Sequence, residues 1–392
     1  MKTLKIGLLG KIFISIVLGI GLGQICPTWT VRIFMTFNSI FSQFLGFIIP
    51  LVILGLVTPA IADIGGRAGK MLVITVALAY GSTVLSGLIS YVSGATLFPS
   101  LITPESGLNT IAEATDNAPY FTVNIPVLMS VMTALVLAFT VGLGLAATQH
   151  PTLLSAAHGF EEIIVKTINT AIIPLLPLYI FGIFLNMTAV GQVFSILTVF
   201  IKIIGIIFVI HIGVLLLQFI IAGCCARKNP FKLLWNMLPA YFTALGTQSS
   251  AATIPVTLQQ TRRNGVSDDI AGFTVPLCAT IHMSGSTLKI TACALALMVM
   301  QGMPYDFWMF AGFILMLGIT MVAAPGVPGG AIMASLGLLQ SMLGFNEDAL
   351  ALMIALYIAM DSFGTACNVT GDGAIAIIVD RLLGKDKKVR DQ

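Results

Sequence analysis

Long apolar runs separated by short polar segments make up the chain. Runs of this length cross the roughly 30 Å hydrocarbon core of a bilayer as helices. Two further apolar segments, "FTALGTQSSAATIPVTL" (242–258) and "GITMVAAPGVPGGAIMASLG" (318–337), are interrupted by Ser, Gly and Pro. Because unwound backbone at membrane depth is tolerated only inside protein or along a cavity, they predict re-entrant helical hairpins over 231–259 and 306–342. The runs that predict eight transmembrane helices are 5–25, 33–62, 70–98, 121–147, 160–190, 193–224, 266–300 and 346–383.

Composition supports an all-α polytopic membrane protein. Of the 392 residues, 57% are hydrophobic and 9% are charged, whereas a soluble protein carries about 25% charged residues. A single transmembrane domain over 1–392 therefore leaves no room for a soluble module. The six cysteines show no paired spacing and indicate packing positions rather than a disulfide framework. The first apolar run lacks a small-residue cleavage site, which favours a retained helix over a signal peptide.

Loop charges predict the orientation in the membrane. If the eight spans alternate, the Lys and Arg residues of the short loops gather on one side, which is then the cytoplasmic side. Both termini are expected there, and the protein is expected in the cell inner (plasma) membrane. The segments 231–300 and 306–384 each combine a hairpin with a polar-marked helix and enter from opposite sides. Inverted repeats of interrupted helices are typical of secondary transporters with a midplane binding site.

A polar stripe marks the last apolar run. Asp361, Thr365, Asn368 and Asp372 fall at i, i+4, i+7 and i+11 and so share one helical face, with Gly364 leaving a bare patch beside them. A carboxylate at the bilayer centre costs roughly 2.5–3.5 kcal/mol. Either the two aspartates form internal ion pairs that lock helices, or one binds a ligand ammonium and the other a cation.

The run 266–300 contains a second polar group, "CATIHMSGSTLKITAC". Gly285 and its flanking serines predict a break about midway, which exposes carbonyls from Thr280 to Met283; a harmless Gly/Ser kink is the alternative. His282 is either a site residue or a hydrogen-bonded core histidine. Lys289 is either an internal cation that faces the site or a side chain that snorkels to the interface.

Five motifs together resemble the glutamate-transporter family, the dicarboxylate/amino acid:cation symporters. They are "FLGFIIPLVILGLVTPAIADIGGRAGKM", "TQSSAATIP", "ATIHMSGST", "APGVPGGA" and "NVTGD", and the likeness covers essentially the whole chain in order. The resemblance implies a homotrimer embedded in membrane lipid, without nucleic acid or a bound cofactor. It implies a rigid scaffold from about 1–66 and 121–190, and transport-domain elements from about 67–98 and 193–384 that move like an elevator.

The resemblance also implies roles for single residues. The substrate amino group is held by the residue matching Asp361, and its α-carboxylate by Asn368 and the first hairpin tip, while the second hairpin tip forms a lid. The matched substrate positions are Gln248, Ser249, Ser250, Met283, Ser286, Val327, Gly329, Ala331, Asp361, Gly364, Thr365 and Asn368. The matched sodium positions are Asp372, Asn368, Cys278, His282, Thr280 and Met283, with Tyr80, Thr83 and Ser284 at a third, degenerate site.

Departures from the acidic-substrate pattern guide the functional prediction. Carriers of glutamate and aspartate have an arginine where Gly364 stands, and some have one where Gln248 stands. Ser284 replaces a sodium-binding aspartate, His282 replaces an asparagine, and Lys289 replaces an aromatic or neutral residue. These departures favour symport of a neutral amino acid with one or two sodium ions, with proton coupling also open.

Two alternatives to neutral amino acid symport stay open, and a third is disfavoured. In one, Lys289 supplies the missing positive charge and the substrate is an acidic amino acid or dicarboxylate. In another, the protein is an uncoupled channel. An intramembrane enzyme that uses Ser284 as nucleophile and Lys289 as base is disfavoured, because a predicted break separates the pair and no oxyanion donor is identifiable. We therefore do not expect an enzyme.

Overall fold

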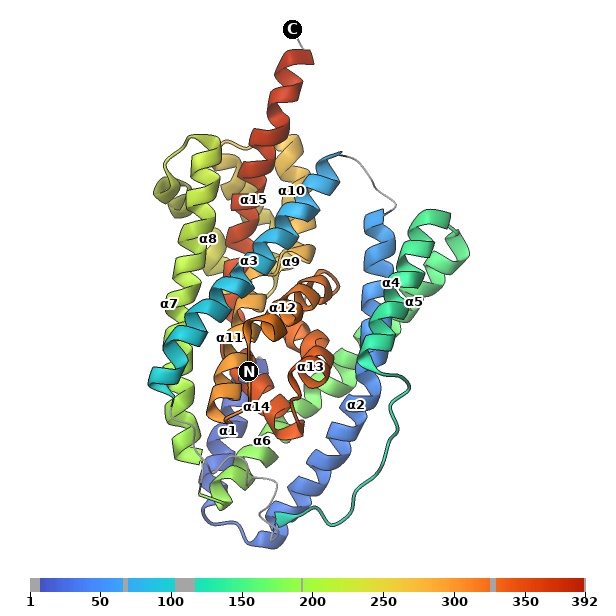
Figure 1. Ribbon diagram of the computed structural model, residues 1–392, viewed down its shortest axis with the longest axis vertical. Coiled ribbons are helices and arrows are strands. Elements are labelled where there is room, and N and C mark those ends of the chain that lie inside the picture. Colours follow the sequence, from blue (N-terminus) through green and yellow to red (C-terminus); the bar gives the residue numbers. More distant parts are fainter. Residues whose placement is uncertain (1–7, 66–69, 103–116, 192, 325–328, 391–392) are drawn as a thin grey trace, which may run out of the picture.

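The computed structural model describes residues 8–65, 70–102, 117–191, 193–324 and 329–390. All regular structure in this part of the chain is helical, as the sequence predicts (Figure 1). The first seven helical elements are α1 (Leu8–Gly23), α2 (Thr28–Gly65), α3 (Lys70–Leu101), α4 (Val131–Thr148), α5 (Pro151–Thr167), η3 (Ile168–Ile172) and α6 (Ile173–Ala189). The remaining elements are α7 (Val193–Ala226), α8 (Pro230–Thr247), α9 (Ser250–Arg263), α10 (Asp268–Ile281), α11 (Ser284–Met300), α12 (Phe307–Val322), α13 (Gly330–Leu343), α14 (Glu347–Ala359) and α15 (Asp361–Arg390).

Apolar helices long enough to cross a membrane account for much of the structure. Among the described residues, six stretches meet that standard of length and composition, and shorter apolar helices include most of α1 and α4. The prediction of eight spans stays a prediction. The six long stretches are Thr28–Asp63, Lys70–Leu101, Pro151–Ala189, Leu197–Ala226, Asp268–Met300 and Asp361–Leu383.

Two of the predicted spans begin at the wrong residue. The span predicted over 121–147 begins only at Val131, where the side chain of Ser130 caps α4 by accepting a hydrogen bond from the Thr133 N–H. Pro126 disfavours a helical conformation for the residue before it, which explains the non-helical segment that precedes α4. The span predicted over 160–190 begins earlier, with Pro151 in the first turn of α5, and it contains a π-helical turn before Pro174 and Pro177.

Both predicted hairpins are present as antiparallel helix pairs. Helices α8 and α9 pack against each other, as do α12 and α13. The first turn falls at Gln248, which has a left-handed backbone, and Ser249 caps α9. Residues 325–328, between α12 and α13 in the sequence, lie outside the described residues, and Gly329 precedes α13.

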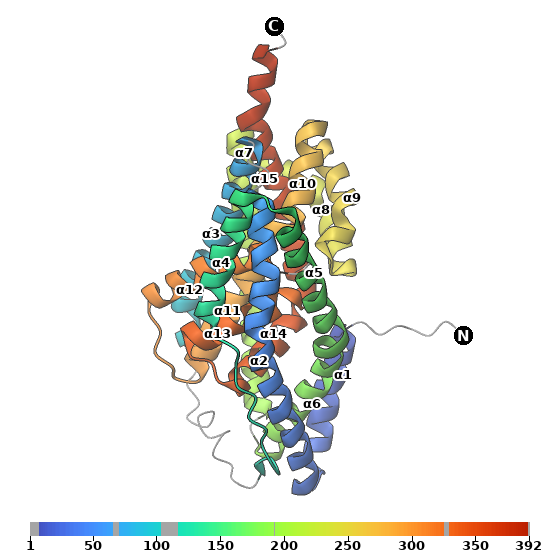
Figure 2. The same cartoon turned by 90° about the vertical axis from the view of Figure 1, so that its right-hand side faces the viewer.

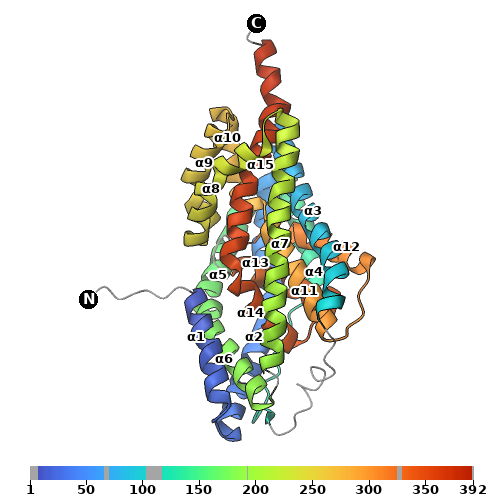
Figure 3. The same cartoon turned by 90° about the vertical axis from the view of Figure 1, so that its left-hand side faces the viewer.

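The helices pack in two groups. One group joins α2 to α4, α5 and α6, with α1 lying against α6. In the other group, α15 runs between the first hairpin with α10 on one side and α3 and α7 on the other (Figures 2 and 3). The groups meet mainly where α13 contacts α2 and α14 contacts α1. Whether they form the scaffold and the moving part of a transporter stays a prediction.

Candidate functional site

Interrupted helices meet at the centre of the second group. His282 and Met283 separate α10 from α11, at the break that the sequence predicts beside Gly285. Met360 separates α14 from α15, and this break is a correction, because 346–383 is predicted as one continuous helix. Gly329, with φ of 76°, directly precedes α13. Helix ends expose unpaired N–H and C=O groups, so this junction is rich in polar backbone.

The polar stripe of α15 faces this junction and is buried throughout. Oδ2 of Asp361 accepts a hydrogen bond from the Gly329 N–H at 2.8 Å. Oδ1 of Asn368 accepts one from the Gly285 N–H at 2.8 Å. Thr365 instead donates to the Asp361 carbonyl within its own helix, at 3.2 Å. The stripe therefore connects the second hairpin to the α10–α11 break.

Asn368 contacts two of the other predicted substrate positions, Met283 and Ser286. Its Nδ2 lies 3.2 Å from the Met283 sulfur and 3.2 Å from the Ser286 hydroxyl. Tyr357 donates to the same hydroxyl from α14, at 3.1 Å. Among the described residues, no hydrogen bond joins Asn368 to Ser249 or Ser250 of the first hairpin, although α9 packs on α15. Ala331 is buried in α13, and Val327 lies outside the described residues.

Lys289 is an internal cation and does not snorkel. It is 1% exposed, and its Nζ lies 3.7 Å from Oδ1 of Asp361. The same ammonium donates to the Met360 carbonyl at 3.0 Å and lies 4.1 Å from the centre of the Tyr357 ring. Its Cε and Nζ occupy the space beside Gly364 that the sequence predicts to be a bare patch. Lys289 thus fills that patch, and an internal ion pair of Asp361 is present.

Asp372 is held by a different partner. Its Oδ1 lies 2.9 Å from Nδ1 of His282, and both side chains are almost fully buried. Among the described residues, Oδ2 of Asp372 is buried without a hydrogen-bond partner. A buried carboxylate oxygen without a partner is costly, so a cation that binds there would be stabilising.

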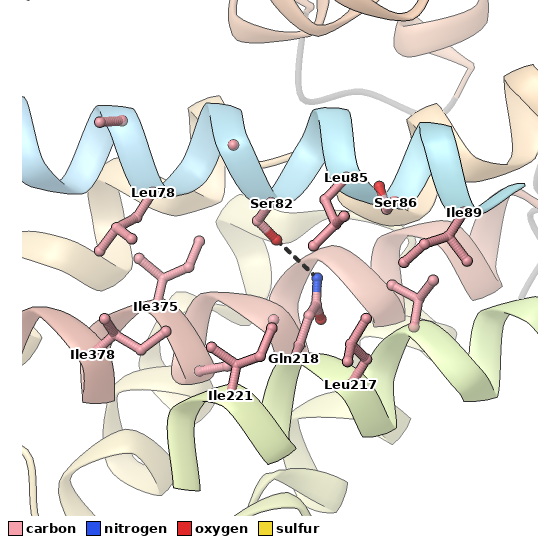
Figure 4. Close-up of a pocket in the computed structure, with 15 residues that line it drawn as sticks. Leu78, Ser82, Leu85, Ser86, Ile89, Leu217, Gln218, Ile221, Ile375 and Ile378 are labelled. Atoms are coloured by element: carbon pink, nitrogen blue, oxygen red, sulfur yellow. Dashed lines mark hydrogen bonds between the residues drawn. The ribbon is translucent and has the colours of Figure 1, made fainter. Parts of the chain in front are cut away.

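Gln218 is a site residue that the sequence reasoning missed. From α7 it donates to the Ser82 hydroxyl at 3.0 Å (Figure 4) and to the Ser284 hydroxyl at 3.1 Å. Ser82 in turn lies 3.1 Å from Nε2 of His282. These groups adjoin a cavity of about 180 Å³ between α3, α7 and α15. The available signal was a lone amide inside an apolar run.

The structure brings together only part of the residue set that was predicted for a third, degenerate ion site. Thr83 accepts a hydrogen bond from the Met283 N–H at 3.3 Å, which brings it to the α10–α11 break near Ser284. The hydroxyl of Tyr80 donates instead to the Leu315 carbonyl in α12, at 3.2 Å. The structure therefore brings two of the three predicted residues together and directs the Tyr80 hydroxyl elsewhere.

The predicted sodium positions on α10 lie in its last turn. The carbonyl of Cys278 accepts the His282 N–H at 2.8 Å, and the Thr280 hydroxyl donates to the Leu277 carbonyl at 2.7 Å. Within the described ranges, no group of three His, Cys, Asp or Glu side chains could hold a metal ion. Sodium prefers oxygen ligands that include backbone carbonyls, so the ends of interrupted helices are suited to it.

Comparison with known proteins identifies the family. Residues 8–382 match the sodium:dicarboxylate symporter family. The chain belongs to this family. This confirms the resemblance drawn from the five motifs.

Two relatives are similar over nearly their full length. The serine/threonine transporter SstT of Acinetobacter baylyi is 26% identical over 400 residues, which cover 96% of this chain and 98% of that protein. The serine/threonine transporter SstT of Acinetobacter baumannii is 28% identical over 402 residues, which cover 96% of this chain and 97% of that protein.

Family membership establishes an integral membrane transporter and not an enzyme. The geometry agrees, because Ser284 and Lys289 do not form a nucleophile–base pair. The Ser284 hydroxyl accepts from Gln218 at 3.1 Å, whereas the Lys289 ammonium donates to the Met360 carbonyl at 3.0 Å.

Proposed function

We propose that this protein is a sodium-coupled symporter of a small neutral amino acid, serine or threonine. The similarity to two serine/threonine transporters supports this substrate. The observation that carries the proposal is the state of Lys289, which is buried and already paired with Asp361. A substrate with a carboxylate side chain would need a cation of its own, because a buried unpaired charge is strongly unfavourable. A zwitterion with a neutral side chain makes no such demand.

The substrate would bind along the α15 stripe. Its ammonium would contact the Asp361 carboxylate, and its α-carboxylate would accept hydrogen bonds from Asn368 and from the first hairpin tip at Ser249 and Ser250. The second hairpin tip, which leads through Gly329 into α13, would close over it. The buried Oδ2 of Asp372, with no partner among the described residues, supports binding of one sodium ion at this carboxylate.

The wider assembly is part of the proposal. Transport would proceed by an elevator movement of the group that contains α15 against the group that contains α2. The protein would be a homotrimer in the inner membrane with both termini in the cytoplasm.

Uptake into proteoliposomes tests the proposal. The purified protein is reconstituted, and labelled serine uptake is measured with an inward gradient of sodium, of protons at equal sodium, or of choline. We expect concentrative uptake only with the sodium gradient, competition by threonine and little competition by aspartate. Uptake driven by protons alone would overturn sodium coupling, and equilibration without concentration would indicate an uncoupled channel.

An acidic substrate is the second candidate, and one observation favours it. The Lys289 side chain occupies the space beside Gly364, where acidic-substrate relatives carry a cation. Binding an acidic side chain would require Lys289 to leave Asp361 and the Met360 carbonyl. Stronger competition by aspartate than by threonine in the same assay would select this candidate.

A further inference from the structure

The ammonium of Lys289 has a complete set of partners inside the protein. It donates to the Met360 carbonyl at 3.0 Å and lies 3.5 Å from the Asp361 carbonyl. The Asp361 carboxylate and the face of the Tyr357 ring provide two further contacts, at 3.7 and 4.1 Å. Carbonyl, carboxylate and aromatic groups all stabilise the charged form of a lysine.

The backbone at Met360 and Gly364 shapes the space that the Lys289 ammonium occupies. Met360 lies at the break, and its carbonyl accepts the N–H groups of Phe363 and Gly364 at 3.1 and 3.3 Å as well as the Lys289 ammonium at 3.0 Å. Gly364 provides the space, because a Cβ at this residue would overlap Cε and Nζ of Lys289. The cation is therefore a built component of the site rather than a side chain that happens to lie nearby.

The Asp361 carboxylate is also satisfied by the protein itself. One oxygen faces Lys289 at 3.7 Å, and the other accepts the Gly329 N–H at 2.8 Å. The carboxylate that would hold a substrate ammonium thus has a fixed cation on one side and the second hairpin on the other.

We propose that Lys289 is a built-in counter-ion that lets the transport domain return across the membrane without substrate. This inference rests on the function proposed above. The charges of Lys289 and Asp361 sum to zero, and the binding of a zwitterionic substrate leaves this net charge at zero. Without Lys289, the loaded site would carry one negative charge with a substrate ammonium beside it, whereas the empty site would leave that negative charge unpaired.

If Lys289 has this role, its loss should affect net uptake and exchange to different extents. Net uptake requires the empty domain to return, but exchange of internal for external substrate does not. The cost of an unpaired carboxylate at membrane depth corresponds to about a 100-fold effect. Loss of the lysine charge should therefore slow net uptake by about 100-fold while exchange changes by less than about threefold.

The test compares both modes in proteoliposomes that contain the Lys289→Met variant. Labelled serine enters vesicles that hold either no amino acid (net uptake) or unlabelled serine together with sodium (exchange), with external sodium in both. Lys289→Gln is measured in parallel, because its amide can still donate to the Met360 carbonyl without a charge. We expect both variants to exchange and neither to accumulate serine in empty vesicles.

The matched control is Lys202→Met. Lys202 lies exposed on α7, where it donates to the Leu101 carbonyl at 3.0 Å, and it has no part in the site. Both modes should stay at the wild-type rate in this variant.

Several outcomes would overturn the inference. Net uptake and exchange that fall together in folded variants would show that Lys289 serves substrate binding or structure alone. Unchanged net uptake, or a wild-type protein that only exchanges, would also contradict it. A wild-type protein that takes up serine in neither mode would instead overturn the proposed function.

If the single variant misfolds, a double variant that removes both charges of the pair distinguishes a charge defect from a packing defect. If Lys289→Met elutes as an aggregate in gel filtration, Asp361→Asn is added to the same chain, which removes both charges of the pair. A folded double variant supports the counter-ion role, because it shows that the unpaired carboxylate was the defect. A double variant that still aggregates shows a packing role and overturns the inference.

Discussion

Asp361 and Asp372 lie on the same helix, α15, and both are buried, yet their carboxylates have different partners. Asp361 has a protein partner on each oxygen, Lys289 on one and the Gly329 N–H on the other. Asp372 has His282 on one oxygen, and its other oxygen has no partner in the described part of the chain. In the proposed function, the Asp361 centre needs no bound cation because Lys289 pairs with it, whereas the Asp372 centre would be completed by a sodium ion. The following substitutions test this difference.

The largest effect is expected for Asp372→Asn. Removal of the negative charge should weaken sodium binding by about 3 kcal/mol, roughly 100-fold in apparent sodium affinity. Sodium titrations of serine binding, followed by calorimetry, measure this. Asp380→Asn is the control, because Asp380 lies on the same helix and instead accepts hydrogen bonds from Ser267. Equal sodium affinities in Asp372→Asn and wild type would remove Asp372 from the ion site.

Asp361→Asn should act on the substrate rather than on the ion. A charge-assisted hydrogen bond to the substrate ammonium is lost, at a cost of about 2 kcal/mol or roughly 30-fold in serine affinity. Calorimetry at saturating sodium gives the affinity directly. If the variant binds serine as tightly as the wild type does, Asp361 does not bind the substrate amino group.

Gly364→Ala tests whether the space beside Asp361 is reserved for the lysine. The new Cβ would overlap Lys289, and overpacking of this kind costs about 1–3 kcal/mol in the free energy of unfolding. Thermal unfolding in detergent should show a lower melting temperature. Gly213→Ala is the control, since open space surrounds that position on α7. Equal melting temperatures for the two variants would mean that Lys289 adjusts without cost.

The same geometry bears on selectivity. An arginine at position 364 is the substitution that the family pattern suggests for gaining aspartate binding. The lysine side chain already fills that space. We therefore expect Gly364→Arg to acquire aspartate binding only in combination with a smaller residue at 289, which competition uptake would show.

The smallest effect is expected for Gln218→Met. Gln218 ties Ser82 to Ser284, and the loss of these bonds should cost about 1 kcal/mol in the free energy of unfolding. The apparent sodium affinity should stay close to the wild-type value, because Gln218 does not contact Asp372 through any hydrogen bond in the described residues. Leu217→Met, in the same cavity, is the control. A large fall in sodium affinity in Gln218→Met alone would add this amide to the ion site.

Local signals in the sequence predicted part of this architecture. The hairpins and the α10–α11 break were predictable because Ser, Gly and Pro cluster where each helix is interrupted. The α15 stripe was predictable from helical spacing alone. The start of α4 was misplaced because the apolar residues before Pro126 satisfy a hydropathy pattern without forming a helix.

Long-range partners explain what the sequence did not reveal. The break at Met360 has no proline beside it. Lys289, which donates a hydrogen bond to the Met360 carbonyl, lies 71 residues away in the sequence. The pairing of Lys289 with Asp361, and of His282 with Asp372, depends on how α11 and α10 pack against α15. Gln218 was overlooked because a single amide in an apolar run does not indicate which distant residues it will contact.

The reversal potential of serine transport in proteoliposomes tests the central claim most directly. If Asp372 accepts a coupling cation, and if Ser284 with the distant Tyr80 hydroxyl leaves the third ion site unable to bind, one or two sodium ions should accompany each serine. Known sodium, serine and voltage gradients then give a potential of zero net flux that corresponds to one of these ratios. A ratio of three sodium ions per serine would contradict the account, and so would a reversal potential that does not change with sodium.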